Sequence, residues 1–126
     1  MKKLFIISLI LVAFSFVSKA KTVNISWLDN NYSGYYTVRL YVQTNDNPPS
    51  TPILVGEKKN VPEAAITFIG SEMNLPTVMN DMHDYYKYIV LVFRQTDPTH
   101  YGNGSSGWLD SDEFLEGANI AEIQIN

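Results

Sequence analysis

An alternation of apolar and polar residues runs through most of this chain and constrains its fold more than any other feature. Residues 35–44 show it best, because one side of an extended chain there carries Tyr36, Val38, Leu40 and Val42. A period of two is typical of a strand that buries one face and leaves the other polar. The same pattern predicts further strands over residues 22–28, 53–59, 64–69, 85–95 and 119–125.

The predicted strands differ in how they are buried. In the first and last strands alternate apolar residues face inward, and these are Val23, Ile25 and Trp27 in one and Ala121, Ile123 and Ile125 in the other. Residues 88–93 are apolar on both sides. That run predicts a central strand covered on both faces, or a strand that lies between a sheet and a loop. Lysines at the end of residues 53–59 are typical of a protected sheet edge.

Turn-forming residues separate these strands. Residues 29–34 are rich in Asp, Asn, Ser and Gly, and residues 45–52 hold three prolines, which cannot join a strand ladder. The pattern predicts an all-β chain folded as an antiparallel β-sandwich of six to eight strands, with a small barrel as the alternative. This outline resembles the immunoglobulin-like and the calcium-lipid-binding-domain-like sandwiches. The Cys…Trp…Cys signature of true immunoglobulin domains is absent from the sequence, and the resemblance implies nothing about function.

The first 20 residues have the order of a secretory signal peptide. Lys2 and Lys3 precede an apolar run at residues 4–18, and the small residues Ser18 and Ala20 fit a cut after Ala20. A membrane-spanning helix needs about 20 apolar residues, and this run is shorter and interrupted by serines. We therefore expect residues 1–20 to be removed as a signal peptide and residues 21–126 to form one domain. No stable membrane insertion is expected after cleavage.

Loss of that segment makes the protein more acidic. It removes three of the nine Lys and Arg residues and none of the thirteen acids, so the formal net charge moves from −4 to −7. An acidic domain lacks the basic surface that binds nucleic acid or an anionic membrane. The chain also has no cysteine, which excludes disulfides, thiolate chemistry and the lipid-accepting cysteine of a lipoprotein. We expect a secreted or periplasmic protein that is not lipid-anchored.

Residues 96–118 are expected to form a long loop between two strands. Loops longer than about 15 residues are uncommon unless they are functional or hold structure of their own. A short helix is predicted inside this one, with Asp110 as N-cap, Glu113 completing a capping box and Gly117 just past the end. Phe114 and Leu115 would then hold the loop against the core.

The sequence offers no arrangement that is typical of an enzyme. Without cysteine, a nucleophilic mechanism needs a Ser-His-Asp set. Neither His83 nor His100 lies near a nucleophile-elbow motif, and phosphate-binding glycine loops and HExxH zinc motifs are absent from the sequence. We therefore expect a protein that is not an enzyme, with no catalytic residues and with both histidines in solvated loops.

Calcium is the one cofactor that the sequence leaves open. Six acids and no Lys or Arg follow Arg94, and calcium takes about six to eight oxygen ligands, often from loops. The candidate ligands are Asp97, Asp110, Asp112 and Glu113, with Asp29 or Asp46 as possible additions. Their spacing does not match the EF-hand motif. The alternative is that Asp110 caps a helix whose N-terminus the neighbouring acids complement.

Aromatic rings on loops are the candidate binding residues. Tyr101 and Trp108 flank the flexible run of residues 102–107, and Tyr32 and Tyr35 flank an earlier turn. Such rings stack on sugars or contact proteins, so the expected partner is a protein or a carbohydrate. For Trp108 the alternative is a buried plug that pins the loop to the sandwich. The expected function is a secreted, non-catalytic binding or interaction module that uses residues 96–118. The alternative is a calcium-stabilised secreted β-sandwich.

Overall fold

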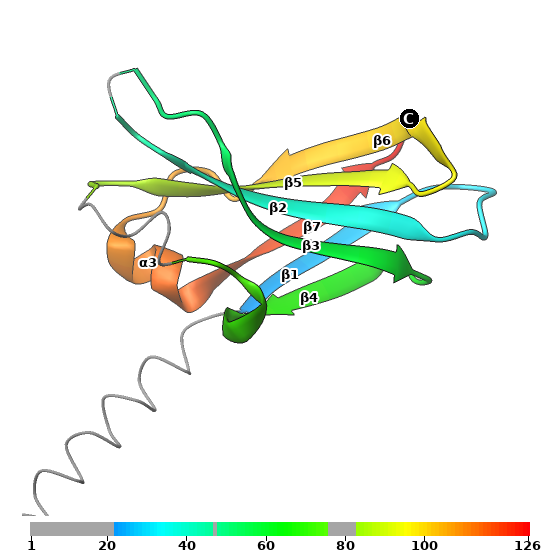
Figure 1. The fold of residues 1–126 in the computed structure, drawn as a ribbon, viewed down its shortest axis with the longest axis horizontal. Helices are drawn as coiled ribbons and strands as arrows, with labels where there is room; N and C mark the ends of the chain where they lie inside the picture. The colour runs from blue at the N-terminus through cyan, green and yellow to red at the C-terminus, as the bar shows by residue number, and fades with distance from the viewer. Residues whose placement is uncertain (1–21, 47, 76–82) are drawn as a thin grey trace, which may run out of the picture.

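The computed structural model describes residues 22–46, 48–75 and 83–126, and within them the chain is nearly all β (Figure 1). The predicted signal peptide, residues 1–20, lies outside the described residues. The strands are β1 (Thr22–Leu28), β2 (Tyr36–Thr44), β3 (Ile53–Val61), β4 (Ala65–Ile69), β5 (Tyr86–Arg94), β6 (Asp97–Ser105) and β7 (Gly117–Gln124). A 3-10 turn, η1 (Gly70–Glu72), follows β4, and a short helix, α3 (Ser111–Glu116), separates β6 from β7.

The strands form two sheets that pack against each other as a sandwich. The larger sheet has the strand order β3-β2-β5-β6, and the smaller sheet has the order β4-β1-β7. Every pairing is antiparallel except that of β1 with β7, which is parallel. The β-sandwich of six to eight strands predicted from the alternation is therefore confirmed, with seven strands in the described residues and with antiparallel pairing in all but one strand pair.

The strand order agrees with an immunoglobulin-like outline. In that architecture strands C′, C, F and G form one sheet, and strands A, B and E belong to the other. The order β3-β2-β5-β6 follows C′-C-F-G, and β1 and β4 take the places of B and E. The difference lies beside β1, where the last strand, β7, takes the place of an N-terminal strand A. Consecutive segments, β6 and β7, therefore supply both sheet edges on one side of the sandwich.

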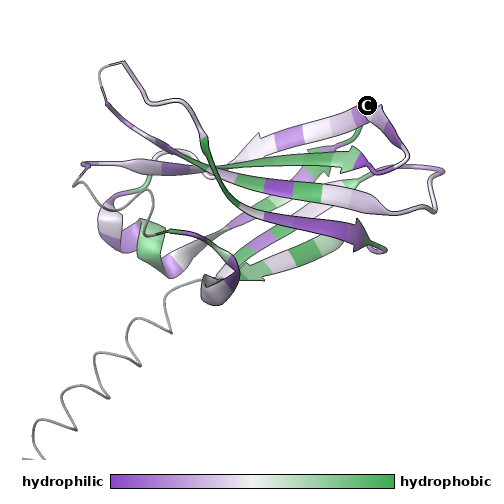
Figure 2. Ribbon diagram, viewed as in Figure 1, coloured by the Kyte–Doolittle hydropathy of each residue, from purple (hydrophilic) through white to green (hydrophobic). Residues whose placement is uncertain are grey.

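The core lies between the sheets and is built from the alternate residues that the sequence predicts. Ten of these side chains are at most 4% exposed: Val23, Ile25, Trp27, Tyr36, Val38, Leu40, Val42, Tyr88, Val90 and Val92. Figure 2 shows the apolar colour along β5 and a polar stretch in the second half of β3. Burial of apolar surface stabilises by about 25 cal/mol per Å², and a chain without cysteine depends on that packing alone.

β5 is a central strand, but only one of its faces is covered. It lies between β2 and β6, as the apolar run predicts. The residues that point inward are buried, whereas the outward residues Ile89, Leu91 and Phe93 are only half-buried. The prediction of cover on both faces is wrong. The described part of the chain forms two sheets, and no third layer of strands or helices covers the outer side of the larger one.

The prediction of a loop over residues 96–118 is wrong for its first half. Asp97–Ser105 form β6, which pairs with β5 so that Tyr101 lies opposite Phe93 and Asn103 lies opposite Leu91. Glycine and asparagine are depleted in strands, and the backbone hydrogen bonds to β5 override that preference here. The segment left between β6 and α3 spans only residues 106–110.

The predicted short helix is confirmed together with its caps. The Oδ1 atom of Asp110 accepts a hydrogen bond from the backbone N–H of Glu113 at 2.8 Å, and Glu113 Oε1 accepts one from the N–H of Asp110 at 3.1 Å. Gly117 follows at a φ of 101°, which only glycine adopts readily. Phe114 is fully buried and stacks on Tyr86 and Tyr88, with ring centroids 4.6 and 4.5 Å apart. α3 thereby seals one end of the core.

β7 differs from its predicted alternation. Ile120 and Ile123 are buried, and Ala121, predicted to face inward, is exposed. A bulge between these two isoleucines, with Glu122 at a φ of 57°, shifts the pattern by one residue. None of the described residues forms a helix that is long and apolar enough to span a membrane.

Candidate functional site

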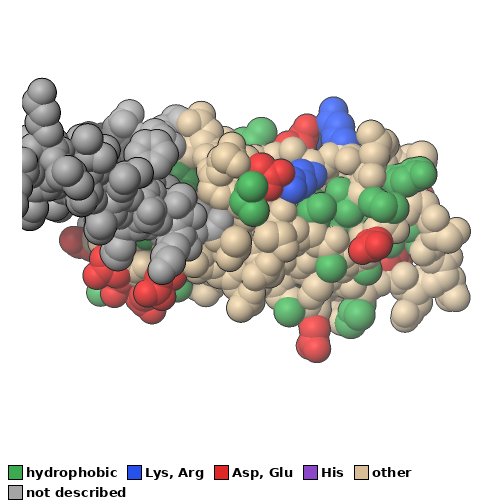
Figure 3. Space-filling model, turned by 90° about the horizontal axis from the view of Figure 1, so that it is seen from below, with side chains coloured by type: hydrophobic (Ala, Val, Ile, Leu, Met, Phe, Trp, Pro, Cys, Tyr) green, Lys and Arg blue, Asp and Glu red, His purple; other side chains and the backbone are tan. Residues whose placement is uncertain are grey.

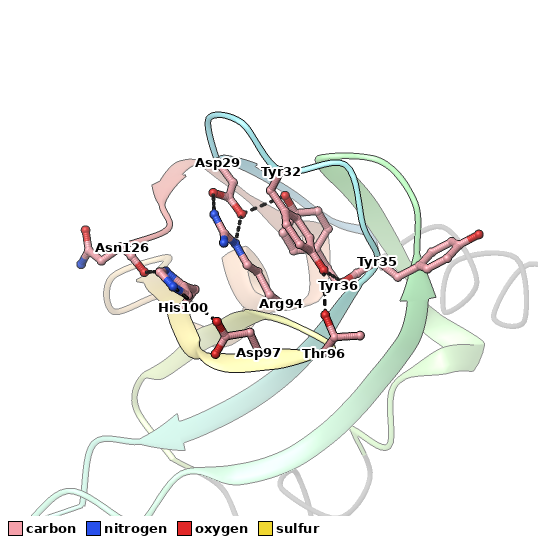
Figure 4. A network of polar contacts seen from close by, with 9 residues as sticks. All are labelled: Asp29, Tyr32, Tyr35, Tyr36, Arg94, Thr96, Asp97, His100 and Asn126. Atoms are coloured by element: carbon pink, nitrogen blue, oxygen red, sulfur yellow. Dashed lines mark hydrogen bonds and ion pairs between the residues drawn. The ribbon is translucent and has the colours of Figure 1, made fainter.

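A polar network closes one end of the sandwich, where the β1–β2 turn meets the β5–β6 turn (Figure 4). Arg94 donates two hydrogen bonds to Asp29, from Nε to Oδ2 at 2.8 Å and from Nη2 to Oδ1 at 2.7 Å. The side chain of Asp29 is only 3% exposed, and the Tyr36 hydroxyl donates a third hydrogen bond to Oδ2 at 3.1 Å. Three donors satisfy the hydrogen-bonding needs of this buried carboxylate.

These contacts shift the acidity of the groups in the network. The hydrogen bonds from Arg94 outweigh the effect of burial and lower the pKa of Asp29 below its usual 3.8. Burial and the hydrogen bond to Asp29 raise the pKa of Tyr36 to about 12. Arg94 also lies over the ring of Tyr32, 4.4 Å from the ring centroid. The charges of Asp29 and Arg94 neutralise each other. Their hydrogen bonds, with that of Tyr36, link the end of β1 to β2 and β5, so the network has a structural role.

The two histidines lie at opposite ends of the sandwich. The Nδ1 atom of His100 lies 2.9 Å from the carbonyl oxygen of Asn126, and its Nε2 atom lies 3.4 Å from Asp97 Oδ2. His83 Nδ1 lies 2.8 Å from Asp46 Oδ1. His100 is in β6 and not in the predicted loop. No serine or threonine hydroxyl is among their contacts in the described residues, so no Ser-His-Asp set forms around them.

The four predicted calcium ligands do not meet at one place. Asp97 begins β6, and Asp110 follows its other end, so the two are separated by a strand of roughly 25 Å. Asp110 and Glu113 hydrogen-bond each other's backbone in the helix cap. Within the described residues no group of three or more His, Asp or Glu side chains is placed to hold a metal ion. Calcium binding by this chain stays a prediction.

Three of the four predicted aromatic contact residues lie toward the end that carries the polar network. Tyr32 belongs to the network itself, with its hydroxyl oxygen 3.4 Å from Thr96 Oγ1. Tyr35 is 54% exposed and points away from the network in Figure 4. Tyr101 lies farther along β6, opposite Phe93 on the outward side of the larger sheet. Tyr32 and Tyr101 therefore do not share a surface.

Trp108 is exposed and is not a buried plug. The neighbouring Leu109 fastens this segment instead, because its backbone exchanges two hydrogen bonds of 2.8 Å with Tyr86. Trp108 is 41% exposed, and the ammonium nitrogen of Lys87 lies 4.3 Å from its ring centroid. Lys87 points outward from β5, because Tyr86 and Tyr88 on either side of it are buried. Trp108 and Tyr101 thus lie beside the same face of the larger sheet.

That face carries a continuous apolar surface, which we term the outer sheet face. It consists of the outward side chains of Tyr41, Leu54, Ile89, Leu91, Phe93 and Tyr101. Strand register places Leu54, Tyr41 and Ile89 side by side across three strands, and Phe93 beside Tyr101. A cation lies among them, because Arg39 covers the Phe93 ring at 5.1 Å and pairs with Glu57 at 2.7 Å. Sequence reasoning predicts Tyr101 as a contact residue but misses this surface, because the apolar run at residues 88–93 is interpreted as covered on both sides.

The chain matches no protein-family model, no curated protein and no solved structure. The surfaces of the molecule are therefore what indicates its function.

Proposed function

We propose that this protein is an exported, non-catalytic interaction module that binds a protein partner through the outer sheet face. The observation that supports this proposal most directly is the half-buried apolar centre of that face, Ile89, Leu91 and Phe93. Contiguous apolar surface on a soluble domain is typical of an interaction site. Aromatic residues and arginine, which are enriched in protein interfaces, frame this centre as Tyr41, Tyr101 and Arg39.

A protein fits this surface better than a carbohydrate does. A sugar ring needs a free, flat aromatic platform with polar groups at its edge. Among the described residues in the middle of this face the only aromatic ring is that of Phe93, and Arg39 already covers it at 5.1 Å. One face of Trp108 is already covered by the ammonium group of Lys87. Apolar side chains with an arginine among them are typical of a protein interface, in which aromatic residues and arginine are enriched.

Export forms part of the proposal because it follows from the first 20 residues. Lys2 and Lys3, the apolar run and the small residues at positions 18 and 20 match a secretory signal peptide. A domain that relies on packing and not on disulfides folds equally well in a reducing or an oxidising compartment.

Site-specific photo-crosslinking in the organism that makes the protein tests the interaction surface. A benzophenone amino acid is placed at Leu91 on the outer sheet face, and at Ala65 on the exposed face of the smaller sheet as a control. We expect one major protein adduct at Leu91 and none at Ala65. The variant Tyr101→Ala should reduce that adduct at least about fivefold, since aromatic truncations at interfaces cost 1 kcal/mol or more.

Two results would contradict the proposal. Adducts of the same mass and yield at both positions indicate random collisions, and the absence of any adduct at Leu91 removes the surface from consideration. A shift of Leu91 signals by a purified polysaccharide, with no protein adduct, would assign the face to carbohydrate instead.

A further inference from the structure

The free edge of β6 has hydrogen-bonding groups without partners. Ser106 donates its N–H to Tyr88 O at 3.0 Å. Backbone groups of every second residue in an antiparallel strand point to the same side, so the N–H and C=O groups of Gly104 and Gly102 also point toward β5. The N–H and C=O groups of the alternate residues Asn103 and Ser105 therefore point away from the sheet. Tyr101 confirms this direction, because its carbonyl oxygen accepts a hydrogen bond from Asn126 at 3.1 Å. No described residue pairs with Asn103 or Ser105 on that edge.

A groove of about 670 Å³ runs along this edge, between β6 and β7. The two strands meet at the hydrogen bond between Tyr101 and Asn126 and separate toward Ser105 and Asn119. The floor is apolar and low, because Gly102 and Gly104 lie against the side chains of Ile120 and Ile123. An extended segment lying there would bond to the edge of β6 and point alternate side chains at the floor.

The opposite side of the sandwich is protected against such pairing. Lys58 on β3 bridges to the smaller sheet, with Nζ 2.9 Å from the carbonyl oxygen of Thr67 and 2.7 Å from Glu72. The backbone of Val55 is occupied by Asn74 at 2.8 Å, and Lys59 is exposed beside them. Charged residues of this kind keep sheet edges from recruiting other chains. Residues 99–109 of β6 and its continuation contain no charged residue other than His100.

Charge distinguishes the two sides further. The described Lys and Arg side chains pair with acids among residues 29–72 or, for Lys87, with Trp108. The six acids after Arg94 have no Lys or Arg on their own segments, and Glu122 lies at the margin of the groove. In Figure 3 each blue group lies beside red, whereas the red side chains at the end of the molecule that carries α3 have no blue beside them. Glu122 is the one charged side chain among the described residues that line the groove, so it would offer a counter-charge to a basic side chain of a bound segment.

We infer that the β6–β7 groove binds an extended, basic segment of a partner protein, which adds to β6 as a further antiparallel or parallel strand. The free backbone of Asn103 and Ser105 supplies the hydrogen bonds, the isoleucine floor accepts small apolar side chains, and Glu122 attracts Lys or Arg. This site adjoins the outer sheet face at Tyr101, which lines both, but it uses the edge of β6 and not that face. Glu122 lies outside the outer sheet face, so a variant there tests the groove without altering the surface of the proposed function.

Selection from a library of random nine-residue peptides displayed on phage tests the inference on residues 21–126. We expect enrichment of peptides in which Lys or Arg alternates with small β-branched residues. For the strongest peptide, made synthetically, the amides of Asn103 and Ser105 should become protected from hydrogen exchange. The amide of Gly104, already bonded within the sheet, serves as the internal reference.

Two variants separate strand addition from mere charge attraction. Asn103→Pro removes one edge N–H that the larger sheet does not use, and it should weaken binding about fivefold to tenfold. Glu122→Lys should weaken binding about threefold or more, with a smaller effect at high salt. Glu63→Lys makes the same charge change in the exposed β3–β4 turn and should have no effect. Melting curves establish that each variant is folded, and Glu122→Lys keeps the test valid if Asn103→Pro does not fold.

Several results would overturn the inference. They are the absence of enriched peptides, the enrichment of acidic ones, equal binding to wild type and Glu122→Lys, or unchanged exchange at Asn103 and Ser105 under saturating peptide. Protection of these amides that rises with protein concentration alone would assign the edge to a second copy of this chain, which also overturns it.

Discussion

At the scale of single residues, the Asp29 carboxylate shows how this fold keeps a charge almost out of water. Burial alone would raise its pKa and favour the neutral acid. Arg94 supplies two charge-assisted hydrogen bonds, and Tyr36 supplies a third donor. The ionised form is therefore the stable one in the folded protein, and removing either partner leaves a buried group without compensation.

We predict that Asp29→Asn lowers the free energy of unfolding at pH 7 by about 2 to 4 kcal/mol, because Arg94 loses its counter-charge. Since the pKa of Asp29 in the folded protein lies below the usual 3.8, its stabilisation is complete above that pH and is lost as the pH falls below it. The difference between wild type and variant should therefore shrink under acid. Urea unfolding at several pH values measures this. Asp97→Asn, an exposed counterpart, should change stability by less than about 0.5 kcal/mol.

We predict that Tyr36→Phe costs about 1 kcal/mol at neutral pH, through loss of one hydrogen bond to a charged group. The pKa of Tyr36 is raised to about 12 in the folded protein from an ordinary 10.0. Its contribution is thus fully present below pH 10 and is lost as the pH rises from 10 toward 12. Unfolding curves of the two proteins should converge over that interval. Tyr35→Phe, on an exposed ring, should behave as wild type at every pH, and a constant gap for Tyr36→Phe would contradict the assignment.

The sequence could predict single buried residues but not this pair. Val38 and Val42 follow from periodicity, because neighbours in a strand decide their face. Asp29 and Arg94 are 65 residues apart, and only the meeting of two turns brings them together. In the same way, nothing in the alternation of residues 119–125 indicates the bulge at Glu122 that turns Ala121 outward.

At the scale of elements, β6 is the strand that local residue propensity fails to predict. Its Gly and Asn residues favour turns, and the strand exists because β5 pairs with it along most of its length. One signal was present in the sequence. Gly102 and Gly104 alternate with Tyr101, Asn103 and Ser105, as expected of a strand whose inner face lies too close to its neighbour for any side chain.

We predict that Gly102→Ala destabilises the protein by about 2 kcal/mol or more, because the added carbon would clash with the backbone oxygen of Gln124 in β7. Gly104→Ala is the matched comparison. Its added carbon would meet only the side-chain tips of Ile120 and Ile123, at 2.9 and 3.0 Å, and these can move. The cost there should be about 1 kcal/mol or less. Chemical denaturation of both variants measures the ranking, and the reverse order would contradict the close packing of β6 on β7.

We predict that Asp110→Ala lowers the free energy of unfolding by about 1 kcal/mol, the usual cost of losing an N-cap. The capping box holds α3 where Phe114 seals the core between Tyr86 and Tyr88. Asp112→Ala removes an exposed acid from the first turn and should cost only a few tenths of a kcal/mol. A loss of equal size from both variants, measured by thermal unfolding, would show that charge and not the cap matters here.

At the scale of the whole molecule, charge and edge protection divide the sandwich into two sides. The β3 side has paired lysines, while the segments that follow Arg94 carry six acids and no Lys or Arg. Composition shows this imbalance directly, but only the fold turns it into a surface, because β6 and β7 lie at neighbouring edges of opposite sheets. The sequence predicts the two-sheet architecture well, because the alternation of apolar residues decides which side of each strand is buried. It does not predict the binding surfaces, because these depend on which strands lie at the edges of the sheets.

The proposed export of this protein can be tested at its predicted cleavage site. The apolar run at residues 4–18 is too short to hold a chain in a bilayer of about 30 Å, so the small residues Ser18 and Ala20 should direct cleavage after Ala20. Protein recovered outside the cytoplasm should have the mass of residues 21–126. Ala20→Arg places a large charge where the peptidase needs a small side chain, and it should leave the precursor uncleaved. Lys21→Arg, one position later, should not. Wild-type protein that keeps residues 1–20 at its destination would contradict cleavage and make the segment an anchor.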